Sequence, residues 1–246
     1  MLSKAQNKYI RSLSQQKYRA EHGVFVVEGD KIAREWLLTG SKIQHIVATA
    51  SWLQHNVKLT DKHPDAVISE VSVDELQTVS QLQTANEVLL VVHKNNDNTI
   101  LPTDEWCIAV DTLQDPGNMG TIIRIADWFG INHIVATADS VDYYNPKVIQ
   151  AAMGGHLRVQ LHTTDLSKFI DNTAMPVYAA ALDGEDVYSL KNITPGVLII
   201  GNESKGISEH IMQKARRKIT IPRRGGAESL NAAVSAGILC ALLIKP

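Results

Sequence analysis

Three stretches of the chain place polar side chains after apolar runs that read as buried strands: residues 111–131 (the first stretch), 198–208 (the second) and 219–241 (the third). In the third stretch, Glu228, Ser229 and Asn231 stand where a helix begins, beside backbone N–H groups that have no partner inside the helix. Just before them, Gly225 and Gly226 allow backbone conformations that other residues avoid. These polar groups can hold a ligand by hydrogen bonds. The alternative is a plain helix cap, formed by Ser229 or Asn231.

The first stretch combines a turn with a helix. Residues 106–110 read as a strand, residues 115–118 (Asp-Pro-Gly-Asn) are a turn signature, and residues 121–129 have the apolar spacing of a helix. Asn118 lies in the turn, and Arg124 projects from the helix away from its apolar side. A lone arginine in such a position is typical of a surface cation or an ion pair, so its chemistry depends on what the turn brings near it.

The second stretch follows the apolar run 197–200 with residues 201–203 (Gly-Asn-Glu). Ligands of open α/β sheets bind beyond the carboxyl ends of the strands, so these residues are expected to face a ligand. Leu182 begins a turn after a further apolar run and falls under the same rule. The alternative for the second stretch is an ordinary strand-to-helix turn, with Ser208 capping a helix over residues 209–218.

Composition describes a globular protein and excludes several classes of site. The chain has 246 residues, of which 44% are hydrophobic and 20% charged, and a formal net charge of −2, so any nucleic-acid partner must be attracted by local basic patches. Cys107 and Cys240 are far apart in apolar surroundings and read as core residues, and the nine histidines lack metal-ligand spacing. No metal is therefore expected. No run is long enough to span a membrane and no apolar signal segment follows Met1, so a cytoplasmic location is expected.

The pattern of elements divides the chain into two α/β domains, at residues 1–95 and 106–246, joined by a linker at 96–105 that is rich in Asn, Asp, Thr and Pro. In the first domain we expect helices at 3–22, 29–38 and 73–79, and strands at 24–27, 43–48, 67–71 and 87–92. In the second, strands at 133–137 and 177–181 and a helix at 145–155 extend the alternation seen in the three stretches. This alternation predicts a mostly parallel sheet with helices on both faces.

Four cations mark the N-terminal helix. Lys4, Lys8, Arg11 and Arg19 fall within about a quarter-turn of one another at roughly 100° per residue. A stripe of this kind can follow the phosphates of a nucleic acid. A solvated helix face with no partner is the alternative.

Together, the three stretches resemble the three motifs of the SpoU, or TrmH, family of RNA ribose 2'-O-methyltransferases: DTLQDPGNMGTIIRIADWFGI for the first, LIIGNESKGIS for the second and the Pro-x-x-x-Gly-x-x-Ser-Leu-Asn pattern for the third. The segment KYRAEHGVFVVEGDKIAREWL resembles the N-terminal substrate-binding domain of many such enzymes. The resemblance implies a smaller α/β RNA-binding domain followed by a parallel-sheet α/β-knot (trefoil knot) methyltransferase domain. It also implies S-adenosylmethionine as methyl donor, ribosomal or transfer RNA as substrate, and a homodimer formed through the C-terminal domain.

The resemblance assigns roles to individual residues. Donor binding falls to Gly201, Ile221 and Leu230, chiefly through backbone atoms, with Leu182 and Asn202 beside them. The ribose 2'-oxygen would be positioned by Asn118, Glu203, Ser229 and Asn231. Arg124 matches the arginine that the family treats as catalytic, often as the base. Because a guanidinium stays protonated in proteins, a second role remains open, in which Arg124 clamps a phosphate and stabilises the developing alkoxide while water takes the proton.

Two departures and two alternatives remain. The family usually has an arginine where this chain has Gln150 and a serine where it has Ala152, which weakens any RNA or donor contact assigned to that helix. A non-catalytic RNA-binding protein that kept the fold is one alternative function. A doubly wound domain that binds a nucleotide phosphate is the other, but the spacing of a P-loop or dinucleotide fingerprint is missing.

Overall fold

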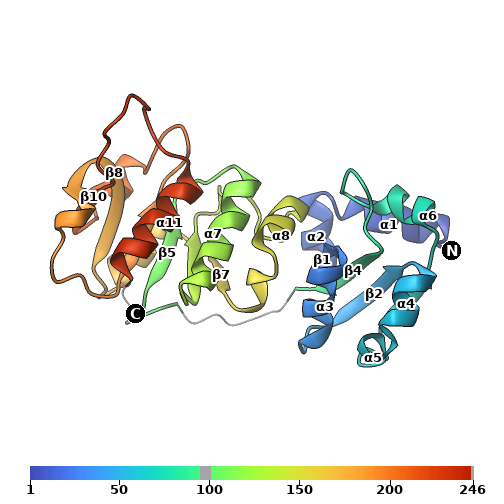
Figure 1. Cartoon of the computed structure of the whole chain (residues 1–246). Helices are drawn as coiled ribbons and strands as arrows, with labels where there is room; N and C mark the ends of the chain where they lie inside the picture. The colour runs from blue at the N-terminus through green and yellow to red at the C-terminus, as the bar shows by residue number, and fades with distance from the viewer. Residues whose placement is uncertain (95–100, 245–246) are drawn as a thin grey trace. The chain divides into compact units, whose positions relative to one another are not determined.

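The chain forms two compact units, seen in a computed structural model that describes residues 1–94 and 101–244 (Figure 1). The first unit contains Met1–Asp97 and Tyr144–Leu157, and the second contains Asn98–Tyr143 and Arg158–Pro246. The predicted linker at 96–105 lies partly outside the described residues. Tyr144–Leu157 belongs to the first unit although it follows the first stretch in sequence. The two units are therefore not continuous segments of chain, and the domain boundaries at 95 and 106 remain a prediction.

The first unit is built on a mixed sheet of four strands in the order β1-β4-β2-β3. The strands are β1 (Val24–Glu28), β4 (Val88–His93), β2 (Ile43–Ala48) and β3 (Val67–Glu70). β1 and β2 run antiparallel to β4, and β3 runs parallel to β2. All four strands occur within a residue or two of the predicted positions.

Helices cover both faces of this sheet, which is why the strands β1, β2 and β4 are apolar on both sides. Phe25 and Val27 of β1 point into a cluster with α3 (Asp30–Leu38), α4 (Ala50–His55) and α8 (Pro146–Ala152). Val24 and Val26 point the other way, toward α1 (Lys4–Ser12) and α6 (Val73–Val79). A short helix, α5 (Val57–Thr60), packs beside α3.

The predicted helix at 3–22 is wrong in one respect, because the structure divides it into α1 and α2 (Gln16–His22). Ser3 caps α1 in a capping box with Gln6, and the chain turns after Ser12 so that Leu13 is buried in the core. The two helices therefore do not share one continuous face.

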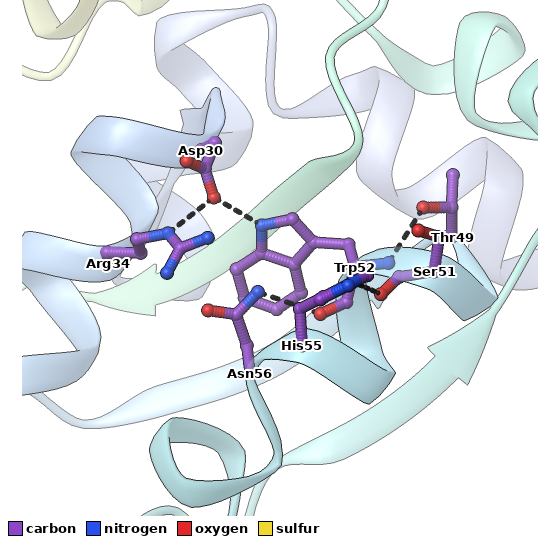
Figure 2. A network of polar contacts seen from close by, with 7 residues as sticks. All are labelled: Asp30, Arg34, Thr49, Ser51, Trp52, His55 and Asn56. Atoms are coloured by element: carbon purple, nitrogen blue, oxygen red, sulfur yellow. Dashed lines mark hydrogen bonds and ion pairs between the residues drawn. The ribbon is translucent and has the colours of Figure 1, made fainter.

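A polar network fixes α4 against α3 in the first unit (Figure 2). Asp30 Oδ1 accepts hydrogen bonds from Arg34 Nε and from Trp52 Nε1, each at 2.6 Å. Asn56 Nδ2 donates to the Trp52 carbonyl at 2.8 Å, and Thr49 Oγ1 accepts from the Trp52 backbone N–H at 3.3 Å. The buried indole is thus satisfied at its polar atom, which makes it a rigid part of the core.

The second unit contains a six-stranded sheet in the order β10-β8-β9-β5-β6-β7, in which every pairing is parallel. The strands are β10 (Arg217–Thr220), β8 (Val177–Asp186), β9 (Val197–Ile200), β5 (Cys107–Val110), β6 (His133–Ala136) and β7 (Gln160–Thr163). The helices α7 (Pro116–Trp128) and α11 (Ala232–Leu243) pack side by side on one face (Figure 1). The helices α9 (Leu166–Asn172) and α10 (Glu209–Met212) pack on the other. The predicted parallel sheet with helices on both faces is confirmed.

Three elements predicted for residues 106–246 are corrected. α7 begins at Pro116 rather than at residue 121, because Asp115 caps it by accepting the Asn118 N–H at 2.8 Å. α8 ends at Ala152, before the predicted limit of residue 155. The predicted helix at 209–218 is only one turn long, since Arg217–Thr220 instead pairs with β8 as a strand. β7 and α9 were not predicted.

Within the two described ranges, no helix is long and apolar enough to cross a membrane.

Candidate functional site

The first two stretches meet at the centre of the parallel sheet. From β5 the chain builds β6 and β7 on one side, and it then returns to add β9 on the other side of β5. The order of strands therefore reverses beside β5, which is where ligands of open α/β sheets bind. The loops that follow β5 and β9 lie next to each other there, joined by a hydrogen bond from Asp111 N–H to the Ile200 carbonyl at 2.9 Å.

Hydrogen bonds between Asp111 and Ser208 hold these two loops together. Asp111 is only 3% exposed, and its Oδ2 accepts from both the backbone N–H and the hydroxyl of Ser208, at 2.7 and 2.6 Å. The Ser208 hydroxyl is thus used by Asp111, and no side-chain cap of α10 forms, contrary to the alternative considered for the second stretch. Sequence reasoning missed this pair, and its one local signal was an aspartate directly after a buried strand.

Thr112 adds a second link between the same loops. Its φ of 57° lies in the left-handed region that non-glycine residues seldom adopt. The Thr112 N–H donates to Thr137 Oγ1 at 2.9 Å, and the Thr112 carbonyl accepts from Asn202 Nδ2 at 2.7 Å. These contacts stabilise the unusual backbone and fix the start of the first stretch against the second.

Side chains from all three stretches join in one hydrogen-bonded chain. Asn118 Nδ2 donates to Glu203 Oε1 at 3.0 Å, and Asn231 Nδ2 donates to Asn118 Oδ1 at 2.8 Å. Asn118 is only 8% exposed, so both ends of its amide are fixed by these partners. The structure therefore brings together three of the five residues to which catalytic roles were assigned.

The packing of α7 on α11 explains this convergence. Both helices start at the same end of the sheet, and a Cβ added to Gly237 of α11 would lie 3.4 Å from Ile125 Cδ1 of α7, which shows how close the two helices come. Asn231 is the N-cap of α11, and its Oδ1 accepts from the N–H groups of Ala233 and Val234. Of the two residues considered as a plain helix cap, Ser229 and Asn231, it is Asn231 that forms the cap, and the same amide donates from its Nδ2 to Asn118.

Glu203 is an anion that positions its neighbours. Burial acts to raise the pKa of its carboxyl, but hydrogen bonds from Asn118 Nδ2 and from the N–H of Asp115 outweigh it and hold the pKa below the usual range. The group is therefore ionised at neutral pH and is a weak base. By accepting the hydrogen bond from Asn118 Nδ2, the Glu203 carboxylate orients the Asn118 amide.

Arg124 and Ser229 lie outside this hydrogen-bonded chain. Arg124 is exposed on α7, six residues and roughly 9 Å along the helix axis from Asn118, and it has no hydrogen bond or ion pair to any of residues 1–94 or 101–244. Ser229 is exposed in the loop before α11, where it lines a pocket. Both side chains are free to contact a substrate.

The pocket lies at the carboxyl ends of β9 and β10, beside residues 180–182 of β8, and has a volume of about 640 Å³. Cofactor sites commonly have roughly 300–1,000 Å³, so a nucleoside-sized ligand fits. Its lining includes every residue assigned to donor binding: Leu182, Gly201, Asn202, Ile221 and Leu230. Leu182 reaches it because β8 is irregular, with Lys218 paired to Ala179 but Ile219 paired to Glu185, so that the residues between them loop out.

Gly201 is required by the close approach of two loop segments. A Cβ at this position would lie 2.3 Å from the carbonyl carbon of Gly206 and from the N atom of Ile207. Asn202 and Gly206 pair through two backbone hydrogen bonds of 2.9 Å, and Gly206 has a φ of 70°. By contrast, Gly225 has no positive φ, and neither has its neighbour Gly226, so the conformational freedom predicted for this glycine pair is not used.

Asn202 lines the pocket, but both polar atoms of its side chain already form hydrogen bonds within the protein. Its Oδ1 accepts from the N–H groups of Ser204 and Lys205, and its Nδ2 donates to Thr112. The amide therefore shapes the loop that borders the pocket, which limits the part it can take in binding a donor.

In the first unit, Lys4, Lys8 and Arg11 form a basic stripe of exposed side chains on α1. A groove with largely polar walls runs beside Lys8 and Arg11 and includes Tyr18 and Gln77. Arg19, the fourth cation assigned to RNA, is only 1% exposed, and its Nη1 donates to the carbonyls of Leu13 and Ser14 at 2.8 Å each. Its assignment to the stripe is wrong, because the break between α1 and α2 turns Arg19 inward.

The position of Ala152 on α8 bears on its departure from the family pattern, in which a serine is usual. Ala152 is buried within the first unit, so neither RNA nor a donor can reach it there. Gln150 lies near Gly29 and Asn86. Arg158, which follows α8 in the chain, forms two hydrogen bonds with the Asp127 carboxylate, at 2.7 and 2.8 Å.

The described residues hold no group of three or more His, Cys, Asp or Glu side chains placed to bind a metal. Cys107 and Cys240 are buried free thiols, as predicted for core residues. Burial raises the pKa of Cys240 to about 12 and shifts that of Cys107 in the same direction, so both thiols stay protonated and unreactive.

Residues 105–241 match the SpoU rRNA Methylase family, and residues 4–90 match the MRM3-like substrate binding domain. The chain belongs to the SpoU rRNA Methylase family. A TrmH-family protein from Porphyromonas gingivalis has a similar structure, with a TM-score of 0.85 and 35% sequence identity over 99% of this chain and 98% of its own. An AdoMet-bound rRNA methyltransferase from Sinorhizobium meliloti aligns with a TM-score of 0.88 and 28% identity, over 99% and 96% of the two chains.

Among sequence relatives, the 23S rRNA (guanosine(2553)-2'-O)-methyltransferase RlmP of Bacillus subtilis is 27% identical, covering 93% of this chain and 92% of its own. The resemblance drawn from the three stretches, and the one drawn from the N-terminal segment, are thus confirmed.

Proposed function

We propose that this protein transfers a methyl group from S-adenosylmethionine to a ribose 2'-hydroxyl of a structured RNA, foremost ribosomal RNA, with transfer RNA as the other candidate. One observation carries the proposal: the loops of the second and third stretches border one pocket, and hydrogen bonds from Asn118 to Glu203 and from Asn231 to Asn118 connect the first stretch to both loops. The AdoMet-bound relative and the rRNA methyltransferases among the relatives support this choice of donor and acceptor. The non-catalytic alternative is not favoured, because the polar residues of all three stretches are present.

The donor would be held largely by main-chain groups of Gly201, Ile221 and Leu230, and it would supply the methyl group to be transferred. Methyl transfer needs the 2'-oxygen in line with that methyl group and a way to lower the cost of losing its proton. Ser229 lines the pocket and can donate to or accept from the hydroxyl, whereas Asn118 is anchored by Glu203 and Asn231 and fixes the start of α7.

Arg124 would act on the RNA as a cation. A guanidinium remains protonated, and it presents several N–H donors in one plane that match phosphate oxygens or a developing alkoxide. Its lack of a partner among the described residues fits this role, since a cation paired with a carboxylate would have to give up that contact. Water would then accept the proton from the 2'-hydroxyl.

Arg124→Ala tests the proposal. We expect donor affinity to be unchanged, RNA affinity to change by less than about tenfold, and single-turnover methylation to fall at least about a hundredfold. Arg124→Lys separates two roles, because lysine keeps the charge but not the planar fork, so only an electrostatic clamp would be partly rescued. Arg216→Ala is the matched control, an exposed arginine of the same unit that does not line the pocket. Methylation by Arg124→Ala at the wild-type rate would remove Arg124 from the mechanism.

We also propose that the protein is a cytoplasmic homodimer whose C-terminal unit carries the knot implied by the family and forms the interface. Trp128 on α7 is 84% exposed and Val234 on the neighbouring α11 is 50% exposed, which supports a partner for this helix pair. Light scattering on the full chain should give twice the mass of one chain. The double change Trp128→Glu and Val234→Glu should give a monomer, and a wild-type monomer at tens of micromolar would contradict the dimer.

A further inference from the structure

Three cations lie on the pocket lining without a carboxylate to neutralise them. Lys205 is in the turn after β9, and Arg223 and Arg224 are in the loop after β10, and all three side chains are exposed. Among the described residues, none of the three forms an ion pair. Arg223 uses one Nη1 to reach the Ala227 carbonyl of its own loop, at 3.3 Å.

The two cations of the preceding strand β10, unlike those of the loop after it, do form ion pairs. Arg217 of β10 pairs with Glu185 of β8 at 2.6 Å, and Lys218 pairs with Asp183 at 3.2 Å. The same part of the chain therefore neutralises its cations on the strand and leaves them free at the pocket. This difference indicates that the free cations serve a ligand rather than the fold.

The charge of the methyl donor does not explain these cations. S-adenosylmethionine carries a sulfonium and an ammonium group against a single carboxylate, so its net charge is positive and an excess of cations opposes its binding. The acids on the described lining are Glu203, which accepts from Asn118 and Asp115, and Glu228, so cations outnumber acids there. A ligand with several negative charges fits this lining better, and an RNA backbone carries one on every phosphate.

We propose that Lys205 and Arg224 bind backbone phosphates of the RNA next to the target nucleotide, so that the ribose is presented at the mouth of the donor pocket. The two side chains come from different loops, and each loop also carries a residue of the site, Glu203 in one and Ser229 in the other. Contacts to phosphate fix the register of a nucleic acid without reading its bases. Arg223, through its bond to Ala227, supports the loop from which Arg224 projects. This inference rests on the proposed function.

The test uses ribosomal RNA purified from cells that lack this protein, together with the variants Lys205→Ala, Arg224→Ala and their combination. Lys218→Ala is the matched control, because it removes a nearby cation that is already paired with Asp183. Three quantities are measured for each: the affinity for S-adenosylmethionine by calorimetry, the affinity for RNA at several salt concentrations, and the single-turnover rate at saturating RNA.

Each single variant should bind RNA about tenfold more weakly, the scale of one hydrogen bond to a charged group, and should lower the salt slope by roughly 0.7 to 0.9. The combination should lower the slope by about twice that amount. Donor affinity and the rate at saturating RNA should stay within about threefold of the wild type, and the control should match the wild type throughout.

Two results would overturn the inference. One is an unchanged RNA affinity and salt slope in the double variant. The other is a loss of donor affinity with RNA affinity retained, which would mean that the cations hold the donor's carboxylate instead. In both cases methylation by the wild type would leave the proposed function standing, whereas a wild type that methylates none of this RNA would refute the function itself.

Discussion

Replacing Gly201 by alanine should weaken donor binding without removing any side chain that contacts the donor. The added Cβ would lie 2.3 Å from backbone atoms of Gly206 and Ile207, whereas ordinary contact begins at 3.4 Å, so this backbone has to move by about 1 Å. Backbone atoms cannot yield by changing a rotamer. The movement must therefore disrupt the turn that borders the pocket.

The size of the effect follows from the hydrogen bonds of that turn. Asn202 and Gly206 exchange two backbone hydrogen bonds of 2.9 Å, each contributing about 1 kcal/mol. Loss of both would cost about 2 kcal/mol, which corresponds to a roughly thirtyfold weaker affinity if the donor needs the turn in its present form. A stability loss of about the same size is expected from the strain.

Calorimetric titration with S-adenosylmethionine measures the affinity, and urea unfolding of the same variant measures the stability. Gly225→Ala is the control, because Gly225 lines the same pocket but a Cβ there meets nothing within 4 Å and its φ is not positive. Its affinity should stay within about threefold of the wild type. If Gly201→Ala binds the donor as well as Gly225→Ala does, the close approach does not shape the pocket and the reasoning fails.

Three further predictions concern other parts of the chain. Burial and the neighbouring His133 lower the pKa of His162 to about 4, so between about pH 6.5 and 4 the unfolded chain binds a proton that the folded chain does not. The free energy of unfolding should therefore fall by roughly 2–3 kcal/mol over this pH range. Urea unfolding at each pH measures the fall, and this part of it should be absent in His162→Gln. Alanine at all three positions of the basic stripe should reduce the salt slope of RNA binding by about three at most and leave donor affinity unchanged, and an unaltered slope would make the stripe a solvated face. Arg19→Ala should lower the free energy of unfolding by roughly 3 kcal/mol, because the buried carbonyl of Leu13 and the partly buried carbonyl of Ser14 lose their donor. An effect below about 0.5 kcal/mol would argue against this structural role of Arg19.

Local signals in the sequence were sufficient for most elements of the fold. Short apolar runs bounded by Gly, Pro or polar residues marked β1, β2, β4, β5, β6 and β9, because a strand buried on both faces leaves few alternatives for such a run. The cap at Asn231 could be predicted as well, since it depends only on N–H groups two and three residues further along the chain. The order of the three stretches was enough to indicate the family.

Where sequence reasoning failed, the deciding contact came from a distant part of the chain. Arg217 and Lys218 were assigned to the end of a helix, but they begin the strand β10, because β8 offers them a parallel edge with acids at Asp183 and Glu185. Arg19 was placed on a surface stripe, and the turn at Leu13 buried it.

The sequence by itself determined which residues could form the site, because strand, turn and cap signals depend on neighbours along the chain. Only the tertiary structure decided which of them meet: Asn118 with Glu203 and Asn231, and Asp111 with Ser208 across a separation of 97 residues. It also placed Tyr144–Leu157 in the first unit. The physical reason is that such contacts depend on the order of strands in the sheet and on the packing of α7 against α11, and no local pattern specifies either.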